Sequence, residues 1–516
     1  MRRTVLAGIA AAVGLVVVIV AVAALTSGGS TKVGDTVLVN REGPIDVRNS
    51  PTIARNPTRG DNLVVTYRMD RPGFSGFLSY SDNGGRTWEQ TVLPLAPDVP
   101  KCAASPQGDP CPFGPDVAFG PDGTLYVLYV ALRGTGNDPG SLWLSTSTDG
   151  GHTLALPTMV SGELAFQARL AIDPKGPVHI TWLQAFGTGN LSFTEPVPYV
   201  VAVRSDDKGK TFSAPVRVSD PARERIGAPS PVVDGKGRLQ VLYTDYKDNQ
   251  RDFSDLPGPP AELPFALVLA TSTDGGKTFG PNTEVDADVL PTRRFLIYLP
   301  EFPQLAAGSG DNLYATWADG RNGDDDVFLR HSSDGGGSWS KPVKVNDNPA
   351  DGTAQFLPKV DVAPDGRVDV LFLDGRNDPA KVLLDAYLAT SDDHGKTFRN
   401  IRMSAQSFDS TVGPSFGTEY GTDFGTKLGL MSTDDRAYAV WTDTHLGTPA
   451  TGRQDVAFTS VALGSSRGGV AVALVVILLL LIGASTVFLV RSRRTKAAPA
   501  RPADNARVPG PRVPGR

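Results

Sequence analysis

Residues 272–279 read Ser-Thr-Asp-Gly-Gly-Lys-Thr-Phe, and the same octapeptide pattern returns five more times along this chain of 516 residues. The other copies begin at Ser81, Ser147, Ser205, Ser332 and Ser391. Successive serines are 66, 58, 67, 60 and 59 residues apart. A period of this size predicts supersecondary units repeated in a propeller or another array.

The chemistry of the octapeptide is that of a tight hairpin turn. Aspartate and serine side chains accept hydrogen bonds from backbone amides two residues further on, and this closes a turn. Glycine supplies a positive φ, and the final aromatic residue packs the turn onto its own sheet. Asn83 replaces the aspartate once and Leu154 replaces the aromatic residue once. We therefore expect the octapeptides to be structural, and we exclude them from the candidate site.

The six octapeptides resemble the Asp-box, or BNR, repeat of the sialidase superfamily and its non-sialidase relatives. The resemblance covers residues 33–463. It implies an all-β propeller in which each box joins the third and fourth strands of a blade. It also implies that the boxes lie on the rim away from the ligand.

A second pattern precedes each octapeptide and occurs once more after the last one. It consists of a turn and then an alternating strand that ends in an aromatic residue. The seven copies are residues 61–67, 122–129, 176–182, 237–243, 311–317, 366–372 and 435–441. This count predicts seven blades, with the six blades of true sialidases as the alternative.

The last predicted blade lacks a fourth strand of its own. After the seventh copy comes one further strand, residues 454–462, and then no octapeptide. Residues 36–40 look like the strands that follow the octapeptides. We expect residues 36–40 to pair with 454–462, because this closes the ring and removes both exposed sheet edges.

The order of strands predicts which residues surround a binding mouth on the face opposite the octapeptides. That face is formed by the loops after each second strand and by the connections between blades. The predicted mouth residues are Asp245, Tyr298, Asp319, Asp374, Asp443 and His445. The alternative for the four aspartates is a turn-capping role, because they stand at equivalent positions of four blades.

A sialidase would need further residues at that mouth. The reaction needs three arginines for the substrate carboxylate, a tyrosine nucleophile paired with glutamate, and an acid/base aspartate. The weak candidates are Arg294, Arg321, Arg376, Glu301, Glu419, Tyr420 and Asp423. The family's F/Y-R-I-P motif is not found; the nearest match, Ala-Arg-Asn-Pro at 54–57, lacks the aromatic residue and the isoleucine.

Composition and charge narrow the class of partner. The chain has 56 glycines and 42 prolines without a collagen period, which is typical of many turns between short strands. Between Arg3 and Arg491 there are 40 basic and 54 acidic residues, a net charge of −14. Such a surface repels phosphate backbones, so we expect no nucleic-acid partner. We also expect no cofactor and no metal site.

The two cysteines, Cys102 and Cys111, lie in a stretch rich in proline and glycine. No further metal ligands lie near them in sequence. Outside the cytoplasm such a pair is typical of one disulfide that closes a short loop. Two free thiols are the alternative.

Two apolar segments predict the topology. Residues 1–32 contain an apolar run behind Arg2 and Arg3, which indicates a signal peptide or an uncleaved anchor. Residues 470–490 carry no charge and precede a basic stretch, which predicts a transmembrane helix. Residues 464–469 then form a linker and 491–516 a disordered cytoplasmic tail. The propeller, 33–463, is expected outside the cell membrane.

Two hypotheses for function follow. In the first, the protein is a cell-surface propeller that binds a glycan, a wall component or a protein ligand at its mouth. In the second, it is an exo-acting glycoside hydrolase of the sialidase type. The absent motif, the seventh blade and the acidic propeller favour the first, since a fold alone does not establish an activity.

Overall fold

The computed structural model describes residues 31–463 except 42, 96–111, 134–137, 163, 187–197, 250–262, 291–301, 350–351 and 415–421; it also describes 510 and 515. Cys102 and Cys111 lie outside the described residues, as do residues 1–30 and the predicted transmembrane helix 470–490. Within the described part, no helix is long and apolar enough to cross a membrane.

The first three blades are four-stranded antiparallel sheets that follow one another along the chain. Blade one consists of β3 (Val47–Arg55), β4 (Leu63–Arg71), β5 (Ser75–Ser81) and β6 (Glu89–Thr91). Blade two consists of β7 (Pro112–Phe119), β8 (Leu125–Arg133), β9 (Asp138–Ser147) and β10 (Thr158–Ser161). Blade three consists of β11 (Ala165–Ile172), β12 (Val178–Gln184), β13 (Tyr199–Ser205) and β14 (Val216–Arg217).

The next three blades repeat this plan. Blade four consists of β15 (Ile226–Val233), β16 (Leu239–Asp245), β17 (Phe265–Ser272) and β18 (Thr283–Val289). Blade five consists of β19 (Gln304–Ala307), β20 (Leu313–Asp319), β21 (Asp326–Ser332) and β22 (Val343–Lys344). Blade six consists of β23 (Gln355–Val362), β24 (Val368–Asp374), β25 (Leu383–Ser391) and β26 (Arg399–Arg402), and β27 (Phe408–Asp409) pairs with β25.

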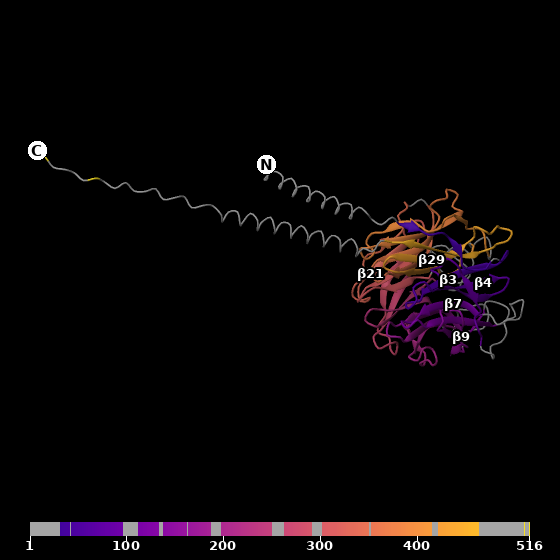
Figure 1. The fold of residues 1–516 in the computed structure, drawn as a ribbon. Helices are drawn as coiled ribbons and strands as arrows, with labels where there is room; N and C mark the ends of the chain where they lie inside the picture. The colour runs from indigo at the N-terminus through magenta and orange to yellow at the C-terminus, as the bar shows by residue number, and fades with distance from the viewer. Residues whose placement is uncertain are drawn as a thin grey trace. The chain divides into compact units, whose positions relative to one another are not determined.

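The seventh blade joins the two ends of the propeller. It consists of β28 (Gly429–Ser432), β29 (Arg436–Asp443) and β30 (Asp455–Ala462), with β1 (Lys32–Val33) and β2 (Val37–Leu38) on its outer edge. Val37 pairs with Phe458, and Lys32 pairs with Ala462. Figure 1 shows β29, late in the chain, beside β3 near its start. The all-β, seven-bladed prediction is confirmed together with its closing strand, and the six-bladed alternative is wrong.

The core lies between neighbouring blades. The second strand of each blade is almost completely buried, because its two faces contact the blades before and after it; β16 is buried at every position. Between blades two and three, for example, Leu128 and Leu142 pack with Ile180 and Trp182. This explains why the aromatic end of the second strand recurs in the sequence.

All six octapeptides lie between the third and fourth strands of blades one to six. In blade five the Ser332 hydroxyl accepts the amide of Gly336 at 2.9 Å and donates to Asp334 Oδ1 at 2.8 Å. Asp334 also accepts the Ser338 amide at 2.9 Å. The turns are therefore closed by their own side chains, as the pattern predicts.

Candidate functional site

A cavity of about 340 Å³ lies on the propeller axis. Its walls are the innermost segments of all seven blades. One polar side chain comes from each blade at a corresponding position. These seven, here called the channel ring, are Thr52, Asp116, Arg169, Ser230, Gln304, Lys359 and Lys427. The lining beyond the ring is mainly apolar, as with Val232, Leu305 and Leu430.

A repeated break in the innermost strand positions the ring. In five blades the pairing register with the second strand shifts just before the ring residue. Two residues before the ring residue, the backbone has a positive φ, as at Ser50, Gly114, Gln167, Ala228 and Leu357. Proline follows four of these residues, since a bulge does not need its missing amide donor.

Two cationic side chains of the ring reach across the channel. Arg169 of blade three extends past blade four and lies over the ring of Phe302, which precedes blade five, with its guanidinium 5.8 Å from the centroid. Lys427, just before blade seven, reaches past blade one to blade two, where its Nζ donates to the Pro115 carbonyl at 3.1 Å. The same Nζ lies 3.9 Å from Asp116 Oδ1.

Lys359 adds a third cation from blade six. Its Nζ donates to Gln304 Oε1 of blade five at 3.2 Å. Two carboxylates face these cations: Asp116, whose Oδ2 accepts the Leu170 amide at 3.0 Å, and Asp361, whose Oδ2 accepts the Ser432 amide at 2.7 Å. With all five groups ionised, the cluster carries one positive charge in excess.

The pKa values of the cluster reflect its burial. Burial, reinforced by the nearby charge of Arg169, lowers the pKa of Lys427 to about 7 despite the attraction of Asp116. Burial also lowers the pKa of Lys359. Burial alone would raise the pKa of Asp116, but Lys427 and Arg169 bring it below its usual range. Burial raises the pKa of Asp361 to about 6.

Some ring contacts also connect blades. The Ser230 hydroxyl accepts the Leu305 amide at 3.0 Å, and Asp116 and Asp361 each accept an amide of the following blade. Arg169 differs, because among the described residues no acceptor for its guanidinium is found. The ring therefore combines hydrogen bonds between blades with cationic side chains whose N–H groups are not all paired with acceptors among the described residues.

The cavity occupies one half of the channel. Its lining residues, such as Ser230 to Val233 of β15, belong to the part of each innermost strand that leads to the second strand. Leu239 at the start of β16 pairs with Ser272, the first residue of an octapeptide. The cavity thus extends from the ring toward the face that carries the octapeptides, although no octapeptide residue lines it.

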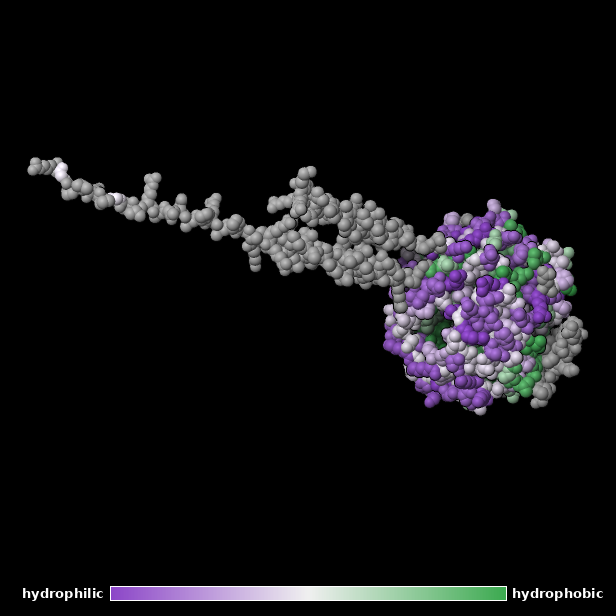
Figure 2. All heavy atoms as spheres, viewed as in Figure 1, coloured by the Kyte–Doolittle hydropathy of each residue, from purple (hydrophilic) through white to green (hydrophobic). Residues whose placement is uncertain are grey.

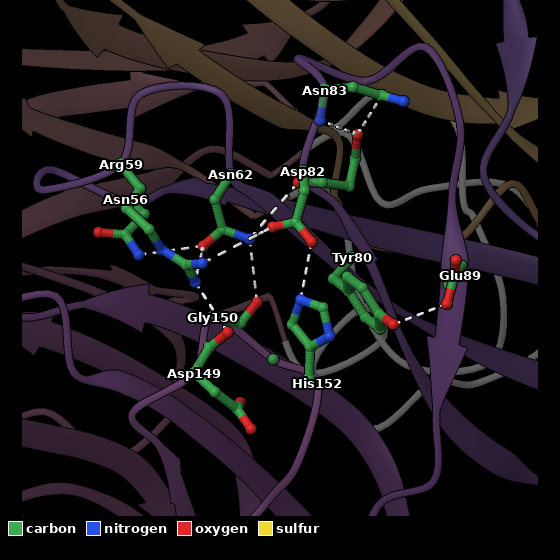
Figure 3. Close-up of polar contacts among 12 residues, drawn as sticks. Asn56, Arg59, Asn62, Tyr80, Asp82, Asn83, Glu89, Asp149, Gly150 and His152 are labelled. Carbon is green, nitrogen blue, oxygen red and sulfur yellow. Dashed lines mark hydrogen bonds and ion pairs between the residues drawn. The ribbon is translucent and has the colours of Figure 1, made fainter.

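On that face, the octapeptides contact the neighbouring blade. Figure 3 shows His152 of the second octapeptide pointing to Asp82 of the first, with Nε2 and Oδ2 2.7 Å apart. Asn62 donates to the Gly150 carbonyl at 3.1 Å, and Arg59 donates to the Asp149 carbonyl at 2.8 Å. These exposed or partly buried contacts join blades one and two at their rims.

The four predicted mouth aspartates end the second strands of blades four to seven. Each accepts the backbone amide two residues further on: Lys247 at 3.0 Å, Arg321 at 2.9 Å, Arg376 at 2.7 Å and His445 at 2.8 Å. Trp317 and Trp441 donate their indole N–H groups to Asp319 and Asp443. The four carboxylates therefore cap turns on the face opposite the octapeptides, and none of them lines the axial cavity.

Asp443 and His445 line a second, smaller cavity of about 160 Å³. Thr36, Leu38 and Gln406 also contribute to its wall. The hydrogen bond that His445 donates to the Asp443 carboxylate raises the pKa of His445.

Three described residues of the predicted catalytic set are held in separate ion pairs. Arg321 donates to Asp319 at 2.7 Å, and Arg376 donates to Asp374 at 2.7 Å. Asp423 accepts from Arg68 at 2.7 Å. None of the three lines the axial cavity. The structure does not bring them together there.

The remaining predicted residues lie outside the described part of the chain: Arg294, Tyr298, Glu301, Glu419 and Tyr420. The mouth opposite the octapeptides therefore stays a prediction. Among the described residues, no group of three or more His, Cys, Asp or Glu could hold a metal ion.

Sequence reasoning missed the channel ring. Its signal is a proline directly before the polar residue, at Pro51, Pro115, Pro229, Pro303 and Pro358. This proline recurs once per blade in five blades, inside the innermost strand or directly before it. It could have been found by aligning the segments that precede the aromatic-ended strands.

Comparisons with known proteins give distant structural likenesses. No protein-family model and no curated protein matches the chain. A protein of unknown function from Dyadobacter fermentans is 14% identical with a TM-score of 0.45, over 84% of this chain and all of that one. The Hadza microbial sialidase Hz136 is 14% identical with a TM-score of 0.44, over 78% and 74%. The phage phi92 endosialidase is 12% identical with a TM-score of 0.45, over 84% and 69%.

At these identities and TM-scores the likenesses carry no argument about function.

Proposed function

We propose that this protein is a membrane-tethered, extracytoplasmic propeller that binds a glycan, a wall component or a protein ligand in its central channel. The observation that carries the proposal is the channel ring, in which each of seven blades contributes one polar side chain to a single cavity. A concave site with a few convergent polar groups is the usual form of a small-ligand site.

The membrane tether is the part of the proposal that comes from the sequence. The apolar segments 1–32 and 470–490 would hold the propeller outside the cell and the basic tail 491–516 inside it. The acidic composition of the propeller is consistent with a partner other than nucleic acid. A ligand in this channel would occupy the cavity between the ring and the octapeptide face.

Binding rather than hydrolysis is the better-supported activity. Arg321, Arg376 and Asp423, which a sialidase-type mechanism would need at one site, each form a different ion pair. A carboxylate-binding arginine cluster is therefore not assembled from the described members of the set.

The test is a glycan array probed with the full-length chain in detergent micelles, beside a panel of fluorogenic glycosides. We expect binding to a subset of glycans without turnover. The double variant Arg169→Ala, Lys359→Ala should lose this binding. Lys210→Ala, an exposed lysine of the third octapeptide, should keep it. Equal binding by both variants would contradict the channel site, and turnover of a glycoside would support the hydrolase instead.

A further inference from the structure

The channel ring gathers more buried positive charge than it neutralises. Arg169, Lys359 and Lys427 come from blade three, blade six and the start of blade seven, and they face Asp116 and Asp361. The three cations are close enough to lower one another's proton affinity. Placing like charges together away from water without full compensation costs free energy, so this positive excess lowers the stability of the folded chain.

Hydrogen-bond capacity is also left over in the ring. A guanidinium has five N–H donors and an ammonium has three. No acceptor for Arg169 is found among the described residues, whereas Lys359 donates to Gln304 and Lys427 donates to Pro115. Arg169, Lys359 and Lys427 all line the cavity of about 340 Å³.

We propose that the channel ring is an oxyanion-binding site in which Arg169, Lys359 and Lys427 together hold a carboxylate, sulfate or phosphate group. Arg169 offers two parallel N–H donors to two oxygens, which is the geometry that carboxylate and sulfate groups accept best. The lysines supply charge from the opposite wall. Asp116 Oδ1 lies 3.9 Å from Lys427 Nζ and attracts its charge.

This site deepens the proposed function, because it names the chemical group that the channel would recognise. An acidic sugar would supply a carboxylate, and a sulfated sugar would supply a sulfate ester. A free inorganic anion has the same chemistry without the sugar.

The experiment is isothermal titration of the full-length chain in detergent micelles, in a low-salt buffer free of other oxyanions. The probes are sodium sulfate, sodium phosphate, glucuronate, glucose 6-sulfate and glucose. We expect the four anionic probes to bind and glucose not to bind. Tighter binding of glucuronate or of glucose 6-sulfate than of the inorganic anions identifies the sugar-borne source.

The variants separate the site from the rest of the surface. Arg169→Gln and Lys359→Gln should each weaken anion binding by about tenfold or more, as expected for the loss of a charge-assisted hydrogen bond. Arg169→Lys should recover part of the affinity, which guards against a folding defect. Lys341→Gln, an exposed lysine beyond the fifth octapeptide, should bind as the parent does.

The two proposals fail in different ways. If glucose binds as tightly as glucuronate, or if Arg169→Gln binds anions unchanged while its melting temperature matches the parent, the oxyanion site is wrong. If sulfate binds through Arg169 but no glycan on the array does, the oxyanion site stands and the glycan proposal falls.

Discussion

Lys427 is a channel-ring residue whose charge changes near neutral pH. Burial and then Arg169 bring its pKa to about 7, while Asp116 opposes them; Lys359 and Arg68 also repel its charge. Raising the pH through 7 therefore removes a cation from the ring. Asp361, with its pKa raised to about 6 by burial, becomes neutral below that pH and leaves the ring more positive.

We therefore predict that anion affinity falls as the pH rises from 5 to 9. Above pH 7 the loss should approach about tenfold per pH unit if the protonated Lys427 is required. Titration with sulfate at pH 6, 7, 8 and 9 measures the effect. Lys427→Met should bind more weakly and show a flatter profile in this range. An equally steep profile in that variant would assign the titration to another group.

His179 is a buried residue whose protonation affects the stability of the fold. It lies in β12 at 1% exposure, and its Nδ1 has no hydrogen-bond partner within the described structure. Burial, and then the charge of Arg204, lower its pKa to about 4. The unfolded chain binds a proton at His179 more readily than the folded chain does. The contribution of neutral His179 to the free energy of unfolding is therefore complete above pH 6.5, and it is lost as the pH falls toward 4.

We predict that His179 accounts for about 3 kcal/mol of the stability lost between pH 7 and pH 4. Chemical denaturation of the parent and of His179→Leu at both pH values measures this contribution. The variant should lose less free energy of unfolding over that range. Protonation of carboxylates in acid lowers the free energy of unfolding of both proteins. The contribution of His179 is therefore the difference between the two losses. A difference near zero would contradict the prediction.

The octapeptide turn is the element whose role the sequence specified best. Its hydroxyl, carboxylate and glycine act within eight residues, so the pattern contains the whole local structure. The second strand was predicted equally well, because a turn, an alternating strand and an aromatic end recur once per blade. Seven copies of that strand gave the blade number.

The channel ring was not readable in the same way. Arg169, Lys359 and Lys427 converge only because their three blades meet at one axis. The local sequence around each residue does not indicate which distant residues it will contact. The aspartates at the ends of the second strands were readable as a repeated feature. Their hydrogen bonds to the amides two residues on explain the repetition as turn capping.

We predict that Ser332→Ala weakens the fifth blade measurably. The change leaves the buried Gly336 amide without the hydroxyl that accepts its hydrogen bond at 2.9 Å. An unpaired buried donor costs about 1–3 kcal/mol, so the free energy of unfolding should fall by that amount. Lys341→Ala, exposed just beyond the turn, is the matched control. Denaturant titration that gives equal stability for both variants would mean that the serine does not close the turn.

Ring closure is a property of the whole molecule that the sequence did predict. The prediction was possible because the last blade had only three strands in the sequence. One strand near the start of the propeller had no partner, so it could supply the missing fourth strand. Asn40 reinforces this closure across the ends: it donates to Asp455 Oδ1 at 2.8 Å, and its Oδ1 accepts the Val456 amide at 2.6 Å.

We predict that Asn40→Ala lowers the free energy of unfolding by about 1–3 kcal/mol, because it leaves the Val456 amide unpaired and removes one donor from Asp455. The loss should be accompanied by aggregation, since an opened blade exposes strand edges. Denaturant titration measures the loss of stability, and light scattering during thermal unfolding measures the aggregation, with Lys341→Ala as the control in both. Unchanged stability in Asn40→Ala would mean that the backbone ladder closes the ring unaided.

Pairing the chain's entry with its exit also fixes how the propeller responds to mechanical load. Lys32 lies opposite Ala462, so tension between residues 31 and 463 acts at right angles to the two strands and strains their bonds one after another. Hydrogen bonds loaded in this way break one at a time, and the force needed is lower than for two strands sheared along their length. Single-molecule stretching between these positions should release β1 and β2 first, before blades one to six yield.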